Sequence, residues 1–410
     1  MSKWIESVLG NHVLINNSVI NRTSQWINYI DISSVSAGFY DDPTRMPLKD
    51  APSRARRLLS NGDTVISTVR PYLKAYFFYK EGEPNTVAST GFAVLTPVSI
   101  DPGFLYYLTT NDQYIQYLTN NCTGSAYPAF NPEVIAQTKV FIPEDIKEQK
   151  SISSILLALD DKIQINLEMN QTLEEMAMTI YKEWFVDFGP FKDVRFVDSE
   201  LGPIPKGWEI KNFFEIADLL SGGTPKTTVN EYWNGDIEWV SAKDIGSAQQ
   251  LMITDTEKKI TTLGLKNSST KLLPANTVIV VARGSVGKFG MISKEMCMNQ
   301  SCYGIYGKPG YDQPFIYLMT ASIIEYLLRV AHGAIFDTIT TSTFQAVKFA
   351  LPPVERLMGF HELVNPLFQM IASNSFEIDT LKETRDYLLP KLISGEIRVK
   401  EANGQIMEVL

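Results

Sequence analysis

The chain has 410 residues, which is too long for one ordinary domain and long enough for two hydrophobic cores. Its 44% hydrophobic and 20% charged content is typical of a globular protein rather than a disordered one. No stretch approaches the roughly 18 apolar residues of a membrane span, and the N-terminal segment lacks an apolar signal core, so neither membrane insertion nor secretion is expected. The three cysteines form no C-x-x-C pair and are expected to be free thiols in a reducing cytoplasm.

The net charge of −9 is unevenly distributed along the chain. Residues 1–143 and 207–352 are each neutral, with 11 and 13 residues of either sign, respectively. The excess acid lies in residues 144–206, with 7 Lys+Arg against 13 Asp+Glu, and in residues 353–410, with 6 against 9. A neutral block can still present a basic face, so the overall acidity does not exclude nucleic acid as a partner.

Residues 1–143 mix strand and helix signals. Thr64–Val69 is a short, mainly β-branched run that ends at Arg70 and predicts a buried strand. Phe104–Leu108 opens a helical pattern, so the block is predicted to be α+β. Arg54, Arg56 and Arg57 form a basic cluster, for which a solvated face is the default interpretation. Tyr127 and Phe130 could stack on a base, but a place in the core is favoured for both.

Residues 144–206 begin with the strongest secondary-structure signal in the chain. Apolar residues recur at alternating spacings of four and three for more than four heptads, which predicts a coiled-coil seam on a long helix. Asn166 and Asn170 interrupt the seam, either as tolerated defects or as a register lock, because a buried Asn penalises misaligned pairing. The predicted seam positions are Ile152, Leu156, Leu159, Ile163, Asn166, Asn170, Leu173, Ala177, Ile180 and Trp184.

The chain then repeats itself. Thr64-Val65-Ile66 and Arg70 recur 213 residues later as Thr277-Val278-Ile279 and Arg283, and Asp31-Ile32 matches Asp244-Ile245 at the same offset. At an offset of 209, Gly124 matches Gly333 and Lys139–Pro143 matches Lys348–Pro352. The duplication predicts that residues 207–352 form a second α+β block equivalent to the first.

Several loops carry residue types that suit phosphate or base contacts. Ser221–Lys226 is a polar, glycine-rich loop ending in a cation, which either brings backbone N–H groups near a phosphate or is a plain turn. Arg283–Lys288 places two cations around a glycine turn after a strand, in the position of Arg70–Lys74, although the arginines could simply cap strands. The candidate DNA-binding residues are Arg54, Arg57, Arg70, Tyr72, Lys74, Gly222, Gly223, Thr224, Lys226, Lys243, Arg283, Ser285 and Lys288.

Residues 353–410 repeat the helical ladder 208 residues after the first one, with Asn374 as a polar interruption. Pro366 lies inside this ladder and is expected to kink the helix or to mark its true start. An antiparallel pairing of the two helices lets each block occupy one end, which predicts a closed, pseudo-two-fold molecule. The predicted seam positions are Phe360, Val364, Leu367, Ile371, Asn374, Ile378, Leu381, Arg385, Leu388 and Leu392.

The sequence contains no complete catalytic motif. The spacing of Gly284 to Lys288 is too short for a P-loop, and Asp187-Phe188-Gly189 lacks the other kinase motifs. The three histidines are too scattered to form a metal site, and the Asn/Asp-Pro-Pro-Tyr/Phe motif of DNA amino-methyltransferases is missing. The sequence therefore predicts neither catalytic nor metal-binding residues.

The order, spacing and duplication of these motifs resemble the specificity subunit of Type I restriction-modification systems. The resemblance covers almost the whole chain. It rests on Pro203–Trp208, Ser221–Pro225, Trp239–Ile245, Val281–Lys288 and Leu159–Ile163 with Asn166. The first block departs from the pattern, since it lacks the Gly-Gly-Thr-Pro loop and has Pro71-Tyr72-Leu73 in place of the glycine turn.

The resemblance implies a division of labour between this chain and its partners. Residues 1–143 and 207–352 would be target recognition domains, each reading one half of a split site in double-stranded DNA. Residues 144–206 and 353–410 would be helical spacers that dock two methyltransferase subunits, with restriction-motor subunits joining the complex. S-adenosylmethionine, ATP and Mg would belong to those partners, so this chain would be non-catalytic, cofactor-free and cytoplasmic.

Other functions remain open at this point. A specificity subunit of a complex that only methylates DNA, without a restriction-motor partner, has the same sequence features. Only the neighbouring genes distinguish it from the subunit of a complete restriction-modification complex. A non-enzymatic protein-binding scaffold would show no DNA binding. A nuclease or methyltransferase acting alone is disfavoured by the missing motifs.

Overall fold

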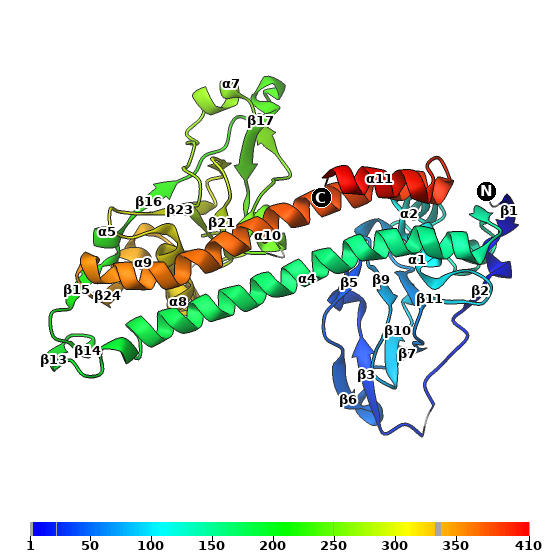
Figure 1. Ribbon diagram of the computed structural model, residues 1–410, viewed down its shortest axis with the longest axis horizontal. Coiled ribbons are helices and arrows are strands. Elements are labelled where there is room, and N and C mark those ends of the chain that lie inside the picture. Colours follow the sequence, from blue (N-terminus) through cyan, green and yellow to red (C-terminus); the bar gives the residue numbers. More distant parts are fainter. Residues whose placement is uncertain (1–2, 22, 249, 333–337, 410) are drawn as a thin grey trace. The chain divides into compact units, whose positions relative to one another are not determined.

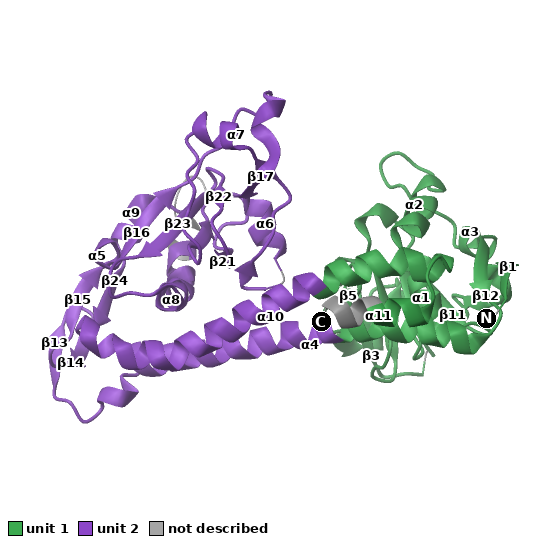
Figure 2. Cartoon of the chain, turned by 45° about the horizontal axis from the view of Figure 1, so that its top comes forward, with its two compact units in different colours: residues 1–161, 381–410 green, residues 162–380 purple. Residues whose placement is uncertain are grey.

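The computed structural model describes residues 3–21, 23–248, 250–332 and 338–409. These residues form two compact units (Figure 2). Unit 1 contains residues 1–161 and 381–410, and unit 2 contains residues 162–380. Helices α4 (Ile146–Phe185) and α10 (Val354–Ser394) each contribute one part to unit 1 and the other part to unit 2. The predicted match of Gly124 with Gly333 lies outside the described residues.

Unit 1 is built on two four-stranded sheets. The first has the order β6 (Thr44–Pro47), β3 (Trp26–Ile30), β10 (Thr86–Ser89) and β7 (Ala55–Leu58), and its β3–β10 pair is parallel. The second is antiparallel, with the order β2 (Val13–Ile15), β11 (Phe92–Pro97), β8 (Asp63–Ser67) and β9 (Tyr76–Tyr79). Smaller pairs are β1 (Trp4–Val8) with β12 (Lys139–Pro143) and β4 (Val35–Ser36) with β5 (Phe39–Tyr40).

The predicted strand and helix of this unit are confirmed. Every residue of β8 is buried, as its β-branched run indicates. Helix α1 (Pro102–Thr110) starts two residues before Phe104, because the Asp101 side chain accepts a hydrogen bond from the Phe104 N–H and caps the first turn. Two further helices follow, α2 (Asp112–Asn120) and α3 (Glu133–Ala136).

Unit 2 likewise contains two main sheets, but one has five strands and the other has three (Figure 1). Its larger sheet has the order β16 (Ala217–Ser221), β23 (Cys302–Gly307), β20 (Val278–Val281), β21 (Phe289–Ile292) and β18 (Met252–Ile253). A second sheet contains β19 (Lys259–Ile260), β17 (Trp233–Val240) and β22 (Cys297–Met298). β13 (Phe196–Ser199) and β14 (Gly202–Pro205) form a hairpin, and β15 (Glu209–Asn212) pairs with the distant β24 (Lys348–Leu351), as β1 pairs with β12 in unit 1. The helices are α5 (Phe213–Ile216), α6 (Ala242–Ser247), α7 (Thr262–Lys266), α8 (Gln313–His332) and α9 (Thr341–Gln345).

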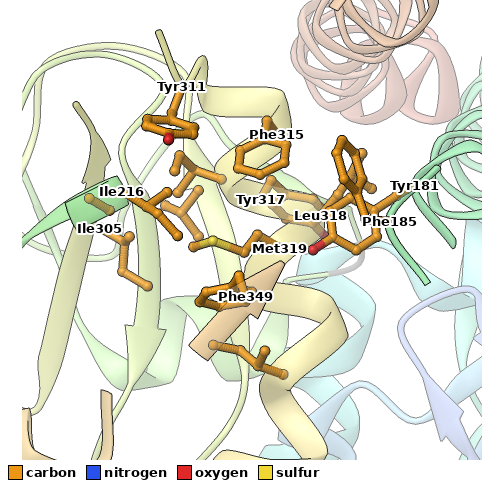
Figure 3. Close-up of a cluster of buried hydrophobic side chains, with 14 of the residues drawn as sticks. Tyr181, Phe185, Ile216, Ile305, Tyr311, Phe315, Tyr317, Leu318, Met319 and Phe349 are labelled. Carbon is orange, nitrogen blue, oxygen red and sulfur yellow. The ribbon is translucent and has the colours of Figure 1, made fainter. Parts of the chain in front are cut away.

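The core of unit 2 forms where α8 packs between the larger sheet and the ends of the long helices. Phe315, Leu318 and Met319 of α8 lie on one side against Ile216, the last residue of α5, and Ile305 of β23. Figure 3 shows them beside Tyr181 and Phe185 of α4 on the other side. All seven side chains are buried, so this cluster ties the recognition-type fold of unit 2 to its portion of the coiled coil.

The duplicated topology confirms the internal repeat and corrects one part of its alignment. The parallel pairs β3–β10 and β17–β22 correspond, as do the antiparallel pairs β8–β11 and β20–β23. Asp31 follows β3 and caps a short turn, whereas the residue that follows β17 and caps α6 is Ser241. Asp31 therefore corresponds to Ser241 and not to Asp244, and the three-residue error arises because α6 has a turn that unit 1 lacks.

Within each unit the two long helices pair antiparallel, as predicted. In unit 2, the side chain of Asn166 on α4 donates to Glu377 on α10 at 2.9 Å. Further along α4, the ring of Phe185 lies 4.9 Å from the ring of Phe360, which precedes Glu377 on α10. In unit 1, Asp160 accepts from Arg385 at 2.7 Å, and Glu148 accepts from Arg398 at 2.9 Å. As residue numbers rise along α4, the residue numbers of its contacts in the C-terminal helical segment fall, so the two run in opposite directions (Figure 1).

The seam follows the predicted heptads over most of its length. Ten of the twelve central seam positions from Leu156 to Leu173 and from Val364 to Leu381 are buried, while Leu367 and Asn374 are half-buried. Beyond Ala177 the predicted residues Ile180 and Trp184 are half-buried and pack against the core of unit 2, whereas their neighbours Tyr181 and Phe185, which the pattern missed, are buried. The shift reflects the 3.6-residue turn of a straight helix, which drifts against a 3.5-residue pattern.

The polar seam residues bond across the helix pair. Asn170 donates to the Ser375 hydroxyl at 3.3 Å and accepts from the Asn374 amide at 2.9 Å. Because any other alignment of α4 and α10 would leave these buried amides without partners, the register lock is favoured over a tolerated defect. Pro366 does not mark the start of the helix, since α10 begins at Val354 and continues through it with the proline exposed on the outer face.

Two other expectations concern the cysteines and the membrane. Cys122, Cys297 and Cys302 are free thiols, and burial raises the pKa of Cys297 to about 11 and that of Cys302 to about 12. Within the described ranges, no helix combines the length and the apolar character that crossing a membrane requires.

Candidate nucleic-acid interface

The candidate interface of unit 2 is an edge where several strands end together. β17, β20 and β22 finish at Val240, Val281 and Met298, and residues 299–301, here called the central loop, lead from β22 into β23. The Asn299 N–H donates to the Val240 carbonyl at 2.9 Å, and the Ser301 carbonyl accepts from the Ala282 N–H at 2.8 Å. The central loop therefore fixes the positions of the segments that follow β17 and β20.

The glycine-rich loop 221–226 packs against the central loop. The Gly223 N–H donates to the Met298 carbonyl at 3.0 Å, and its carbonyl accepts from the Trp239 indole at 2.9 Å. A Cβ at Gly222 would lie 2.0 Å from the Asn299 carbonyl oxygen. Both glycines thus serve close backbone packing, and the Gly223 N–H is not free to bind a phosphate as the sequence suggested.

Replacing Gly223 with alanine is expected to destabilise unit 2 by about 2–3 kcal/mol, because backbone cannot move aside as a flexible side chain can. The added Cβ would meet the Thr270 nitrogen at 2.4 Å. Gly207→Ala is the matched control, since Gly207 has a φ of +91° but no heavy atom within 4 Å of an added Cβ. It should lose about 1 kcal/mol from backbone strain alone. Urea denaturation of both variants measures the difference, and equal losses would contradict the packing role.

The polar side chains of this edge face outward. Thr224 bonds to Gln300 of the central loop, and Gln300 is itself exposed. Lys226 is exposed and makes no ion pair within the described ranges. Lys243, in the first turn of α6, pairs with Glu257 at 2.5 Å, and this hydrogen-bonded carboxylate raises the pKa of Lys243.

The turn after β20 carries the predicted cations into solvent. Arg283, Ser285 and Lys288 are exposed, and neither cation forms an ion pair in the described part of the chain. Gly284 and Gly287 have φ values of 90° and 84°, so the tight turn depends on the left-handed conformations that glycine adopts without strain. A Cβ at Gly246 of α6 would meet the Ser285 hydroxyl at 3.3 Å, which places this turn beside the helix that carries Lys243.

The equivalent edge of unit 1 is held by charged side chains. β3 and β10 end at Ile30 and Ser89, and residues 89–91 occupy the place of the central loop. Arg54 donates to Asp31 at 2.6 Å and to the Tyr29 hydroxyl at 3.0 Å, and its carbonyl accepts from the Thr90 N–H at 2.8 Å. Burial works to raise the pKa of Asp31, but hydrogen bonds from Tyr29 and Ser33 lower it overall, so Asp31 is a carboxylate at neutral pH.

The remaining predicted residues of unit 1 fall into two groups. Arg70, Tyr72 and Lys74 lie together in the turn after β8, at the same edge as Asp31 and Arg54. Arg57 lies within β7, where burial lowers its pKa and its Nε has no hydrogen-bond acceptor among the described atoms. The edge residues are better placed for a ligand than Arg57.

Sequence reasoning missed the central loop and misplaced one aromatic residue. Asn299, Gln300 and Ser301 are ordinary polar residues whose only sequence signal is their position after a short strand that corresponds to β10. Phe130 is in the core as expected, but Tyr127 is 71% exposed and not buried. The Arg70 guanidinium lies over the Tyr127 ring, 4.7 Å from its centroid, which explains how an exposed tyrosine is held in place.

This edge has the chemistry of a binding surface. The outward side chains are amides, hydroxyls and cations, which suit base edges and phosphates. Among the described residues, no group of three or more His, Cys, Asp and Glu side chains is arranged to hold a metal ion.

Comparison with known proteins identifies the family to which this chain is similar. The sequence matches the family described as "Type I restriction modification DNA specificity domain" over residues 15–175 and again over residues 205–372. The specificity subunit of the Type I restriction enzyme HindI from Haemophilus influenzae is 27% identical over 414 aligned residues, covering 85% of this chain and 90% of the relative. The specificity subunit of the enzyme MjaIX from Methanocaldococcus jannaschii is 30% identical, covering 73% of this chain and 69% of the relative.

A solved structure shares the fold. The Type I restriction-modification S subunit from M. genitalium superposes with a TM-score of 0.59 at 12% identity, covering 95% of this chain and 96% of that one. The two family matches coincide with the two copies of the repeat and together span most of the sequence. The chain therefore belongs to the family of Type I restriction-modification specificity subunits, with two recognition domains in one polypeptide.

Proposed function

We propose that this chain selects the DNA target of a Type I restriction-modification complex. Each recognition domain reads one half of a bipartite site in double-stranded DNA through the edge where β3, β8 and β10, or β17, β20 and β22, come to an end. The observation that carries the proposal is the recurrence of this edge in both units, with Arg70 and Arg283 at the same point after corresponding strands.

Within this proposal, residues 1–143 and 207–352 are the recognition domains, and residues 144–206 and 353–410 are the helical spacers. The spacers dock two methyltransferase subunits, and restriction-motor subunits join through the complex. Their net acidity supports protein docking rather than DNA contact, because acidic helices repel phosphates. The chain itself is non-catalytic, acts in the cytoplasm, and leaves S-adenosylmethionine, ATP and Mg to its partners.

Methylation sequencing tests the function directly. DNA is sequenced from cells that carry this chain with its methyltransferase partner, and from cells that lack either one. A bipartite methylated motif that requires both genes is the expected result and also supplies the target sequence. Absence of any motif beside an active, expressed methyltransferase would overturn the proposal and favour a protein-binding scaffold.

The contribution of Arg283 is tested separately. Arg283→Ala is expected to weaken DNA binding by the assembled methyltransferase roughly five- to tenfold, about 1–1.4 kcal/mol, and to reduce the salt dependence by about one ion. The reason is that Arg283 is exposed and forms no ion pair with any described residue, so its loss removes a phosphate contact without disturbing a described ion pair.

Lys192→Ala is the control, since the Lys192 side chain is 67% exposed, makes only a long 3.7 Å ion pair with Glu183, and follows the turn Gly189–Phe191, away from the strand ends. Fluorescence anisotropy with the identified motif at several salt concentrations measures both variants. Unchanged affinity of the Arg283 variant would remove this residue from the interface.

A further inference from the structure

The turn after β8 presents two large apolar side chains to solvent. Tyr72 is 50% exposed and Leu73 is 62% exposed, and they are adjacent in a short 3-10 turn, Pro71–Leu73. The preceding Pro71 is buried and anchors the turn in unit 1. A pair of neighbouring apolar residues at a polar, strand-end edge is unusual for a surface that contacts water alone.

The backbone on both sides of this turn is strained. Arg70 has φ and ψ of 48° and 57°, and Lys74 has 55° and 36°, so both adopt the left-handed conformation without being glycine. L-residues lose roughly 1–2 kcal/mol in this conformation, so the surrounding structure must hold them there. The Leu73 N–H donates to the Arg70 carbonyl at 2.9 Å and the Lys74 N–H to the Pro71 carbonyl at 2.8 Å, which closes the turn.

Side-chain contacts fix the turn from both flanks. The Arg70 guanidinium donates to the Ala126 carbonyl at 3.2 Å and covers the Tyr127 ring, while the Arg70 N–H donates to the Pro128 carbonyl at 2.8 Å. On the other flank, Lys74 pairs with Asp112 at the start of α2 at 2.7 Å. The two apolar side chains are thus carried on a rigid support, which lowers the entropy lost when they enter a binding partner.

The corresponding turn of unit 2 lacks this feature. Gly284 and Gly287 supply the positive φ angles without strain, and Ser285 is the exposed residue at its tip. Val286 is half-buried and packs on the core of unit 2. At the tip of its turn, unit 2 therefore offers the small polar Ser285, where unit 1 offers tyrosine and leucine.

We propose that Tyr72 and Leu73 form a wedge that enters between two base pairs of the half-site read by unit 1 and unstacks that step. This inference rests on the proposed function. The occupant is duplex DNA because two cations, Arg70 and Lys74, bracket the wedge at the strand-end edge, and apolar side chains with flanking cations are the means by which DNA-bending proteins open a base step. No wedge is expected in the half-site read by unit 2, since its turn carries no large exposed apolar side chain.

The test uses the assembled methyltransferase and duplexes with 2-aminopurine at successive positions of both half-sites. The fluorescence of this base rises when it loses its stacking neighbours. The methyltransferase turns its target base out of the duplex, so the target positions of both half-sites are left out of the comparison. At the remaining positions, the unaltered protein is expected to raise the fluorescence at one step in a single half-site. In the variant Tyr72→Ser with Leu73→Ser, that rise should disappear, while affinity for the motif falls roughly tenfold, in line with the loss of stacking on a base.

A matched control is Leu14→Ser, because Leu14 is 50% exposed on β2 of the same unit. It should leave both the signal and the affinity unchanged, and melting curves verify that all variants fold. A rise that persists in the double variant, or its absence in a complex that binds the motif, would overturn the wedge. Failure of the proposed function is a different result, since no duplex would then be bound selectively. Loss of methyltransferase assembly in the double variant, with no unstacking signal in the parent complex, would instead assign the wedge to a protein partner.

Discussion

Phe360→Ala is expected to destabilise unit 2 by about 3–5 kcal/mol, the loss typical of truncating a fully buried phenylalanine. The Phe360 side chain has no exposed surface. Its ring centroid lies 4.9 Å from that of Phe185, 5.7 Å from that of Trp184 and 6.0 Å from that of Phe315. One ring thus joins α10 to both α4 and α8, and its removal leaves a cavity that three elements border.

The same helix offers the control. Phe376 is 50% exposed on α10, so Phe376→Ala should change the free energy of unfolding by less than about 1 kcal/mol. Urea denaturation followed by tryptophan fluorescence measures both variants. The expected outcome is a lower midpoint for the unit 2 transition in the Phe360 variant alone. Similar losses in the two variants would show that helix propensity, rather than the aromatic cluster, governs the result.

Arg385→Met is expected to destabilise unit 1 by about 2–3 kcal/mol. Arg385 occupies a seam position where an apolar residue is usual, and donates to Asp160 at 2.7 Å. Removing it leaves a half-buried carboxylate whose remaining side-chain hydrogen bond, among the described residues, is the one from the Tyr107 hydroxyl at 2.5 Å. Breaking a fully buried pair costs about 3–5 kcal/mol, and the lower figure applies here because both side chains are about a quarter exposed.

A double-mutant cycle isolates this interaction. Asp160→Asn keeps an acceptor for Tyr107 and removes the charge, so the variant carrying both substitutions should lose less than the sum of the single variants. Burial alone would lower the pKa of Arg385, but the Asp160 carboxylate raises it overall. The attraction between Asp160 and Arg385 thus stabilises the charged form of the guanidinium. Lys80→Met, at the more exposed pair with Asp161, should be close to neutral. Additive losses in the cycle would contradict the coupling.

The elements that were predicted well are those whose signal is local. The heptad pattern of Leu156 to Leu173 specifies both the helix and its buried face, and the β-branched run at Thr64 specifies a buried strand. The seam residues Tyr181 and Phe185 were missed because helical drift accumulates slowly and the pattern alone does not show where the coiled coil gives way to the packing of α8.

The candidate interface was harder to predict because it is assembled from distant segments. Gly223, Arg283 and Gln300 meet only after β23 has paired with β16 and β20, and β22 with β17. This strand order cannot be read from periodicity. The sequence identified Gly223 and Arg283 as polar loop residues, yet the packing role of Gly223 depends on its distance from Thr270. For the same reason Tyr127 looked like a core residue, since nothing in its neighbours reveals that Arg70 covers it.

The discontinuous composition of unit 1 has a consequence for biosynthesis. Residues 162–380 are made between its two portions, and at about 5–20 residues per second the ribosome needs roughly 10–45 s to add them. During that interval the apolar face of Leu156 and Leu159 has no Leu381 or Leu388 to cover it. Unit 2 is contiguous and can complete its core first. Unit 1, whose first residues are translated before unit 2, is therefore the last unit to be completed, and the nascent chain carries an exposed apolar helix face until α10 is made.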